Sequence, residues 1–188
     1  MIEFSDFQRA VRDTLKRDIT PASNPEQNDA IGAPASQSLS VVAGPGSGKT
    51  TVIVLRVLKL IFIEDVDPAA ILVTTFTKKA AGELRSRILG WGDMLRRAFL
   101  QARISPSLHQ RLRGLDFNRV ITGTVDSIAE QVLTDNRLPG TPPPIVVEDF
   151  VANALMIGKL WPHGRFRDQD LRDFVASVRG SAWNLNLG

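Results

Sequence analysis

The sequence predicts an α/β fold in which parallel strands alternate with helices. Three short apolar runs, at residues 39–42, 71–76 and 119–124, have the β-branched composition of buried strands. Each run is followed by a segment with helical periodicity. A repeated order of strand, connection and helix is the pattern of an α/β domain with a parallel sheet.

The composition narrows the class of protein. The 188 residues are enough for one domain and the start of a second, with an ordinary globular profile of 43% hydrophobic and 23% charged residues. Cysteine is absent, and His109 and His163 lie far apart, so neither a disulfide framework nor a metal cluster is expected. The N-terminal segment is charged, and the longest apolar run, residues 52–63, contains Arg56 and Lys59. We therefore expect no signal peptide or membrane span, and a cytoplasmic protein.

The chain begins with a predicted amphipathic helix at residues 2–17, which either packs on the domain or binds a partner. A second helix is predicted to start at Asn24 as the cap and Pro25 as the first residue. Gln27 then lies in its first turn. A glutamine amide can pair with the donor and acceptor edge of adenine, although a surface glutamine is the simpler interpretation.

A glycine-rich segment follows the first predicted strand. It consists of Ala43, Gly44, Pro45, Gly46, Ser47, Gly48, Lys49 and Thr50, followed by Thr51 at the start of a predicted helix over residues 51–63. Glycines at this density let successive N–H groups point at one anion, and the helix N-terminus adds its own N–H groups and dipole. In a P-loop the lysine reaches the β- and γ-phosphates and the Thr hydroxyl binds Mg²⁺, so Lys49 and Thr50 are the catalytic candidates, with ATP and Mg²⁺ as cofactors. Ala43 replaces the usual first glycine, and a glycine-rich turn without a ligand is the alternative.

The next strand, residues 71–76, leads into a predicted helix at residues 77–89. Thr77 is its expected N-cap, and Lys78 and Lys79 lie in the first turn, where their charge opposes the helix dipole unless a phosphate lies in front of them. A break is predicted at Gly90 to Gly92, followed by one or two basic helical pieces at 93–113, interrupted by Ser105-Pro106.

After the third strand, a helix is predicted at residues 126–133, capped by Thr124 or Asp126. A proline-rich linker at 138–144 divides the chain into a first domain, 1–138, and a helical part, 139–188. Amphipathic helices are predicted within that part at 147–157 and 168–178.

Positive charge is concentrated in one segment. Residues 77–119 contain ten Lys or Arg and three Asp or Glu, whereas the rest of the chain contains thirteen basic and seventeen acidic residues. A basic segment beside a nucleotide site favours nucleic acid as a partner; the alternative is a solvated helical face.

Four motifs together resemble the N-terminal motifs of the UvrD/Rep family of superfamily 1 DNA helicases. They are Pro25-Glu26-Gln27, the segment 43–51, the segment 75–81 and the segment 123–127, in this order. The resemblance covers residues 22–135 and implies an incomplete RecA-like P-loop domain, with the start of a helical insertion after it. It implies that Gln27 reads adenine, and that single-stranded DNA is contacted by Thr75, Phe76, Thr77, Lys78, Lys79, Thr124 and Ser127.

Phe76 has the alternative of core packing, whereas an exposed ring would stack on a base. Two positions depart from the family pattern. Lys78 stands where asparagine is common, and Val125-Asp126 stands where the family usually has Phe-His, so we interpret Asp126 as structural.

The resemblance implies a parent protein that unwinds DNA with 3′-to-5′ polarity and acts on single strands and duplex junctions. The family's Walker B Asp-Glu pair and second RecA-like domain have no counterpart in these 188 residues. We therefore expect weak ATP binding, little or no hydrolysis by this chain alone, and exposed sheet edges. The alternatives are a non-enzymatic nucleotide- and DNA-binding module, and another P-loop enzyme such as a kinase, which would need a Walker B acid and a lid.

Overall fold

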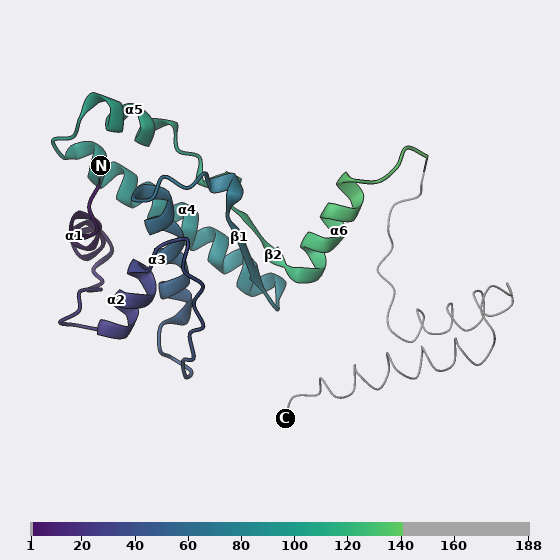
Figure 1. Cartoon of the computed structure of the whole chain (residues 1–188), viewed down its shortest axis with the longest axis horizontal. Coiled ribbons are helices and arrows are strands. Elements are labelled where there is room, and N and C mark those ends of the chain that lie inside the picture. The colour runs from purple at the N-terminus through teal and green to yellow at the C-terminus, as the bar shows by residue number, and fades with distance from the viewer. Residues whose placement is uncertain (1, 141–188) are drawn as a thin grey trace, which may run out of the picture. The chain divides into compact units, whose positions relative to one another are not determined.

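The computed structural model describes residues 2–140 of the chain (Figure 1). Its elements in chain order are α1 (Phe4–Leu15), α2 (Pro25–Gly32), α3 (Lys49–Phe62), a 3-10 turn η1 (Pro68–Ala70), β1 (Leu72–Thr75), α4 (Lys78–Gln101), α5 (Pro106–Gly114), a 3-10 turn η2 (Phe117–Arg119), β2 (Ile121–Thr124) and α6 (Val125–Asp135). The chain divides into two units after Val132. The helices predicted at 147–157 and 168–178 lie outside the described residues, and the division at residue 138 stays a prediction.

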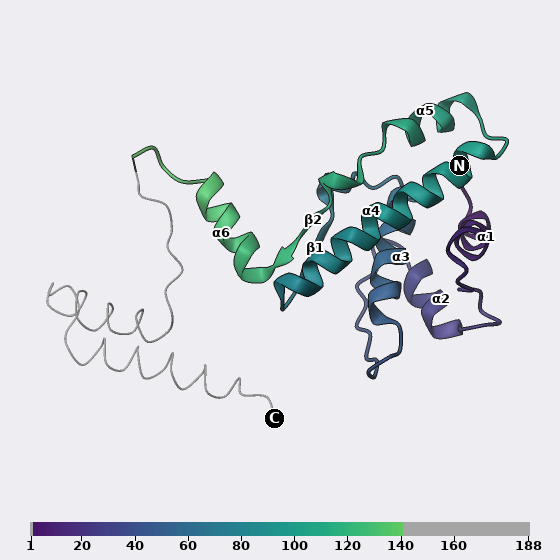
Figure 2. The ribbon, with the colours of Figure 1, turned by 180° about the vertical axis from the view of Figure 1, so that it is seen from behind.

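Strands β1 and β2 form a parallel pair, which confirms the predicted α/β class. Leu72 pairs with Ile121 and Thr75 with Thr124 at the two ends of the ladder. Helix α4, in the connection between the strands, covers one face of the pair (Figure 1 and Figure 2). Val73 is buried toward that side, whereas Leu72 and Ile121 are exposed on the other. Only one face of this two-stranded sheet is therefore packed within the described residues.

The strand predicted at residues 39–42 is wrong. The chain there has no strand structure, and Val42 is 99% exposed. An extended segment becomes a strand only when a neighbour accepts and donates its backbone hydrogen bonds. Among residues 2–140 the sheet consists of β1 and β2 alone, and they pair with each other. The apolar run therefore lacks the partner that its composition anticipates.

The break predicted at Gly90 to Gly92 is also wrong, because α4 runs through it to Gln101. A Cβ at Gly92 would lie 3.0 Å from three atoms of the Phe117 ring, which packs against the bare backbone at that point. A helical glycine costs about 1 kcal/mol relative to alanine, and close ring packing offsets this cost. The predicted interruption at Ser105-Pro106 is confirmed: Ser105 caps α5, and Pro106 is its first residue.

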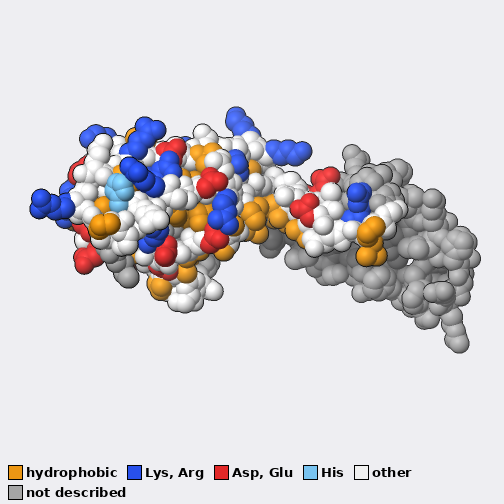
Figure 3. Space-filling view, turned by 90° about the horizontal axis from the view of Figure 1, so that it is seen from above, with side chains coloured by type: hydrophobic (Ala, Val, Ile, Leu, Met, Phe, Trp, Pro, Cys, Tyr) orange, Lys and Arg blue, Asp and Glu red, His pale blue; other side chains and the backbone are white. Residues whose placement is uncertain are grey.

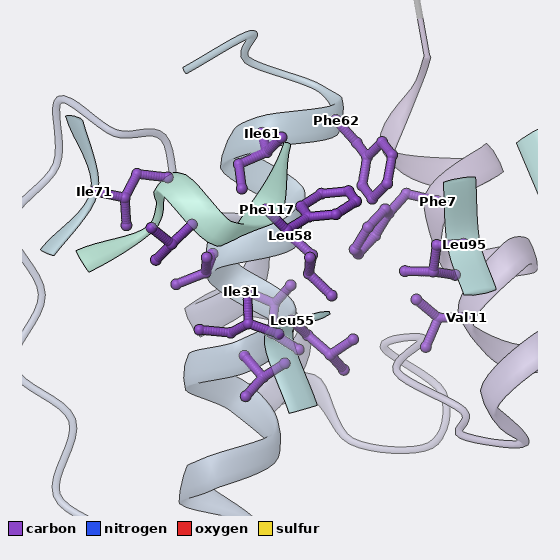
Figure 4. Packing of buried hydrophobic residues seen from close by; sticks show 14 of the residues in the cluster. Phe7, Val11, Ile31, Leu55, Leu58, Ile61, Phe62, Ile71, Leu95 and Phe117 are labelled. Atoms are coloured by element: carbon purple, nitrogen blue, oxygen red, sulfur yellow. The ribbon is translucent and has the colours of Figure 1, made fainter. Parts of the chain in front are cut away.

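The core of the first unit is built around α3. The ring of Phe62 lies 5.2 Å from that of Phe99 and 5.6 Å from that of Phe117, measured between centroids, and contacts Phe7 of α1 on another side (Figure 4). Phe7 and Val11 are buried, so α1 is a packing helix, as the first alternative predicts. No helix within residues 2–140 is long and apolar enough to cross a membrane.

One ion pair is buried at the end of α3. The Lys59 side chain, with the residue only 3% exposed, contacts the Glu64 carboxylate at short range. Glu64 also accepts a hydrogen bond from the Ala35 amide at 2.8 Å. Burial alone would raise the pKa of Glu64, but the hydrogen bonds from Lys59 and Ala35 and the charges of Lys59 and Arg56 outweigh burial and lower it. The ionised carboxylate is thus part of the folded structure.

This pair predicts an acid-sensitive component of stability. Because the pKa of Glu64 is lower in the folded chain than its ordinary value of 4.5, the stabilisation is complete above the unfolded pKa and is lost as pH falls through the folded pKa. We expect Glu64→Gln to show a shallower loss of urea-unfolding free energy below about pH 4.5 than the wild type. The matched control is Glu83→Gln, which removes a carboxylate from an exposed pair with Arg87. Parallel pH curves for the wild type and Glu64→Gln would contradict the assignment.

Candidate nucleotide and nucleic-acid site

The glycine-rich loop leads directly into the N-terminus of α3. Gly46 has φ 77° and Gly48 has φ 81°, both in the left-handed region that side chains other than glycine rarely adopt. Gly48 is the N-cap of α3, and Lys49 is the first helical residue. Loop backbone and first-turn N–H groups therefore lie together, an arrangement that favours an anion.

The side chains of the loop close over its own backbone. The Lys49 amine donates to the carbonyl oxygens of Ala43 at 3.0 Å and Gly44 at 2.5 Å. The Ser47 hydroxyl donates to the Gly44 oxygen at 2.8 Å. Lys49 is exposed, so its ammonium group lies at the surface of the loop, where a phosphate would meet it.

Gln27 lies against this loop, twenty residues away from it in the sequence. The Asn24 carboxamide caps α2 by accepting from the Gln27 amide at 3.0 Å, which confirms the predicted cap. The Gln27 side-chain nitrogen donates to the Ser47 carbonyl at 3.0 Å, and a Cβ on Gly48 would lie 3.1 Å from the same nitrogen. The side chain predicted to read adenine is therefore in contact with the glycine-rich loop.

The loop fits a nucleoside triphosphate with Mg²⁺. At Gly44 and Gly46 a Cβ would meet no atom within 4 Å, so the loop backbone is open for a ligand to approach. Thr50 is half-buried in the first turn of α3 and offers a hydroxyl oxygen to a cation. Thr51 is buried, so it could serve a ligand through its backbone. Residues 2–140 contain no group of three or more His, Cys, Asp or Glu that could hold a metal.

The ends of the two strands bring the other candidate segments together. Thr75 and Thr124 are partners in the ladder, so the chain leaves the sheet at neighbouring points into α4 and α6. Phe76 is 100% exposed, which excludes core packing as the reason for this residue. The hydroxyl of Thr77 accepts from the Ala80 amide at 3.2 Å, which confirms the predicted cap of α4. Lys78 and Lys79 follow, both exposed.

At the start of α6, Thr124 and Ser127 bind each other. The Thr124 hydroxyl accepts from the Ser127 amide at 3.2 Å, and the Ser127 hydroxyl donates to the Thr124 carbonyl at 2.9 Å. Thr124 is therefore the cap, and Asp126 is an exposed residue of the first turn. The geometry explains why these residue types open the helix, because hydroxyls satisfy backbone groups that the helix leaves free.

The basic segment is only partly a positive surface. Several of its arginines form ion pairs with carboxylates: Arg87 with Glu83, Arg96 with Asp93, Arg111 with Asp65 and Arg119 with Asp67. Figure 3 shows Lys and Arg side chains interspersed with acidic ones on the described surface in that view. The charge excess of residues 77–119 is therefore a weaker indication of nucleic acid than the exposed Phe76, Lys78 and Lys79 at the strand ends.

Arg56, which links α3 to α2, was not among the site residues predicted from the sequence. Its guanidinium donates to the carbonyls of Ala30 and Ala33, both at 2.8 Å. The available signal was an Arg and a Lys three residues apart, Arg56 and Lys59, in an otherwise apolar helix.

The sequence was compared with protein-family models and with curated proteins. A family model described as the UvrD/REP helicase N-terminal domain matches residues 23–140. DNA helicase II of Escherichia coli is 49% identical over 65 residues, which are 35% of this chain and 9% of that protein. The ATP-dependent DNA helicase SRS2 of Saccharomyces cerevisiae is 36% identical over 110 residues, 58% of this chain and 8% of that protein. DNA helicase II of Haemophilus influenzae is 34% identical over 115 residues, 61% of this chain and 13% of that protein.

The chain thus spans a small part of the length of these relatives. The matched residues include the glycine-rich loop at residues 43–50 and both strand ends. Because the family model covers more than half of the sequence, the chain belongs to the UvrD/REP helicase N-terminal domain family.

Proposed function

We propose that this chain is the ATP-binding portion of an ATP-dependent DNA helicase with a RecA-like first domain. The observation that carries the proposal is the hydrogen bond from Gln27 to the Ser47 carbonyl of the glycine-rich loop. It places the residue proposed to bind adenine beside the loop proposed to bind the triphosphate. The relatives named DNA helicase II and SRS2 support the same function.

Lys49, Thr50 and Gln27 have different roles in this proposal. The Lys49 ammonium exchanges its bonds to the Ala43 and Gly44 carbonyls for the β- and γ-phosphates. The N–H groups of the loop and of the first turn of α3 hold phosphate oxygens, and Thr50 orients a magnesium ion. Gln27 holds the adenine edge. Bound Mg²⁺-ATP would supply the β–γ phosphoanhydride bond, and its hydrolysis to ADP and phosphate would drive the parent enzyme.

The DNA contacts of the proposal lie at the ends of β1 and β2. Phe76 stacks on a base of single-stranded DNA, and Lys78 and Lys79 contact phosphates in front of the α4 N-terminus, which relieves their unfavourable position at the dipole. Thr75, Thr77, Thr124 and Ser127 contribute contacts from the same strand ends. Duplex junctions are the expected substrate of the whole parent, with 3′-to-5′ translocation.

We further propose that the 188-residue chain binds ATP but turns it over slowly or not at all. Neither β1 nor β2 ends in the Asp-Glu pair that positions Mg²⁺ and the attacking water in this family. DNA-stimulated hydrolysis by the purified chain would contradict this part of the proposal. Binding of ATP and DNA without turnover, in a full-length parent as well, would favour the non-enzymatic binding module instead.

The DNA surface has a direct test in the salt dependence of binding. For single strands, each phosphate contact contributes about 0.7 to the slope of log affinity against log salt. We expect the double variant Lys78→Ala and Lys79→Ala to lower the magnitude of this slope by about 1.4, measured by fluorescence anisotropy of a labelled oligonucleotide. Folding should be unaffected or slightly improved, because both lysines oppose the α4 dipole.

The matched control is Arg97→Ala. Arg97 is also exposed on α4, about 28 Å farther along the helix axis. This variant should keep the wild-type slope. Equal slopes for the double variant and the wild type would place the DNA surface elsewhere.

A further inference from the structure

Arg56 forms the main polar connection between α3 and the C-terminal end of α2. Besides its bonds to the Ala30 and Ala33 carbonyls, its second terminal nitrogen donates to the Pro34 carbonyl at 3.2 Å. One guanidinium therefore satisfies carbonyl groups that the last turn of α2 leaves without helical partners. Its positive charge also lies at the negative end of the helix dipole.

Lys59 and Glu64 extend this connection. The Lys59 amine donates to the Ala33 carbonyl at 2.9 Å, so Ala33 accepts from two cations. The Glu64 carboxylate accepts from the Ala35 amide and pairs with Lys59. Burial leaves Lys59 no water to bind in their place, so its polar contacts hold the segment after α2 on α3.

This connection is one of the contacts that position helix α2, together with the hydrogen bond from the Gln8 side chain of α1 to the Asn28 side chain at 2.7 Å. Helix α2 has only eight residues, of which Ile31 is the buried one. A helix of two turns is marginal by itself and owes its order to tertiary contacts. The opposite end of the same helix carries Gln27 to the Ser47 carbonyl of the phosphate loop. A shift of α2 would move Gln27 away from the loop.

We propose that Arg56, supported by Lys59 and Glu64, is a positioning residue for adenine selectivity. This inference rests on the proposed function, because it assigns to Arg56 the placement of Gln27 beside a bound nucleotide. Helix α3 then has two tasks: its first turn holds the phosphates, and Arg56, two turns later, holds the helix that reads the base. The phosphate contacts do not depend on Arg56, whereas the base contact does.

The test compares the affinities of the Arg56→Met variant for ATP and for GTP. Methionine retains an apolar stem but lacks the guanidinium group. We expect the affinity for ATP to fall about tenfold toward that for GTP, as expected for loss of one or two hydrogen bonds to the base. The affinity for inorganic tripolyphosphate should stay within twofold of the wild type. Gln27→Ala should lose the same preference, and the double variant should be no weaker than Gln27→Ala alone, because both changes remove one interaction.

The matched control is Arg111→Met. Arg111 on α5 donates to the carbonyls of Phe62 at 2.6 Å and Ile61 at 3.3 Å, at the far end of α3, so it makes the same kind of contact without touching α2. This variant should lower thermal stability and leave the preference for ATP over GTP unchanged. Should Arg56→Met not fold, Arg56→Lys is used; it keeps the charge, cannot span three carbonyls, and should lose part of the selectivity.

A second measurement does not require nucleotide. In the chain without nucleotide, the hydrogen-exchange rate of the α2 amides is measured relative to that of the α4 amides. This relative rate should be higher in Arg56→Met than in Arg111→Met. The inference would be overturned if Arg56→Met weakened the binding of ATP and of tripolyphosphate equally. It would also be overturned if the losses of ATP affinity in Arg56→Met and Gln27→Ala were additive in the double variant. Either result would leave the proposed nucleotide site intact. Faster α2 exchange in a chain that binds no nucleotide would instead contradict the proposed function and preserve the structural role of Arg56.

Discussion

Lys49→Ala should reduce the affinity of this chain for ATP by about ten- to a hundredfold, because a hydrogen bond to a charged group contributes about 1.5–3 kcal/mol. The Lys49 amine already reaches across the loop to the carbonyls of Ala43 and Gly44. An anionic phosphate is a stronger partner for an ammonium group than a neutral carbonyl is. Titration with a fluorescent ATP analogue measures the loss directly.

Lys79→Ala is the appropriate comparison. Lys79 is also an exposed lysine in the first turn of a helix, but it follows β1 instead of the glycine-rich loop. It should keep wild-type affinity for ATP and lose affinity for single-stranded DNA. Equal effects of the two substitutions on ATP binding would mean that the nucleotide is held by general positive charge and not by the loop.

Phe62→Ala should cost about 3–5 kcal/mol of unfolding free energy, the range for removal of a buried phenylalanine. Phe62 is fully buried, and its ring contacts the rings of Phe7, Phe99 and Phe117, which come from three other elements. Small domains have a total stability of about 5–15 kcal/mol, so this single substitution should remove between about a fifth and all of the free energy of unfolding. Urea unfolding followed by circular dichroism measures this change.

Phe76→Ala, in contrast to Phe62→Ala, should weaken DNA binding and leave stability nearly unchanged. Phe76 is exposed and packs on nothing that the fold needs, so Phe76→Ala should change stability by no more than about 0.5 kcal/mol. It should weaken single-stranded DNA binding by about 1–3 kcal/mol if the ring stacks on a base. Wild-type DNA affinity for Phe76→Ala would remove the stacking role from the proposal.

Several local features were predictable because each depends on neighbouring residues alone. Asn24, Thr77 and Ser105 cap helices through side chains that bond to amides three residues later. Glycine at positions 46 and 48 anticipates the positive φ values of the loop, since other residues are strained there. The parallel pairing of β1 and β2 followed from the strand–helix–strand order between them.

Two features could be seen only in the tertiary structure: the absence of a strand at residues 39–42 and the continuity of α4 through its glycines. Both depend on which residues, distant in the sequence, pack against the segment. The apolar run at 39–42 has strand composition, but strand formation needs a paired neighbour, and none lies beside it in residues 2–140. The glycines of α4 are common helix breakers, yet Gly92 is required by the ring of Phe117, from a segment 25 residues later. Neither outcome can be derived from the residues adjacent in the chain.

The candidate site divides in the same way. The sequence by itself predicted a phosphate-binding loop at residues 43–50, because glycine backbone freedom, a lysine and a hydroxyl act within a few consecutive residues. Only the tertiary structure decided that Gln27 contacts Ser47 and that Arg56 holds the helix that carries Gln27. Both are long-range hydrogen bonds to backbone carbonyls, and a carbonyl is present at every residue, so composition cannot indicate which one a side chain will reach.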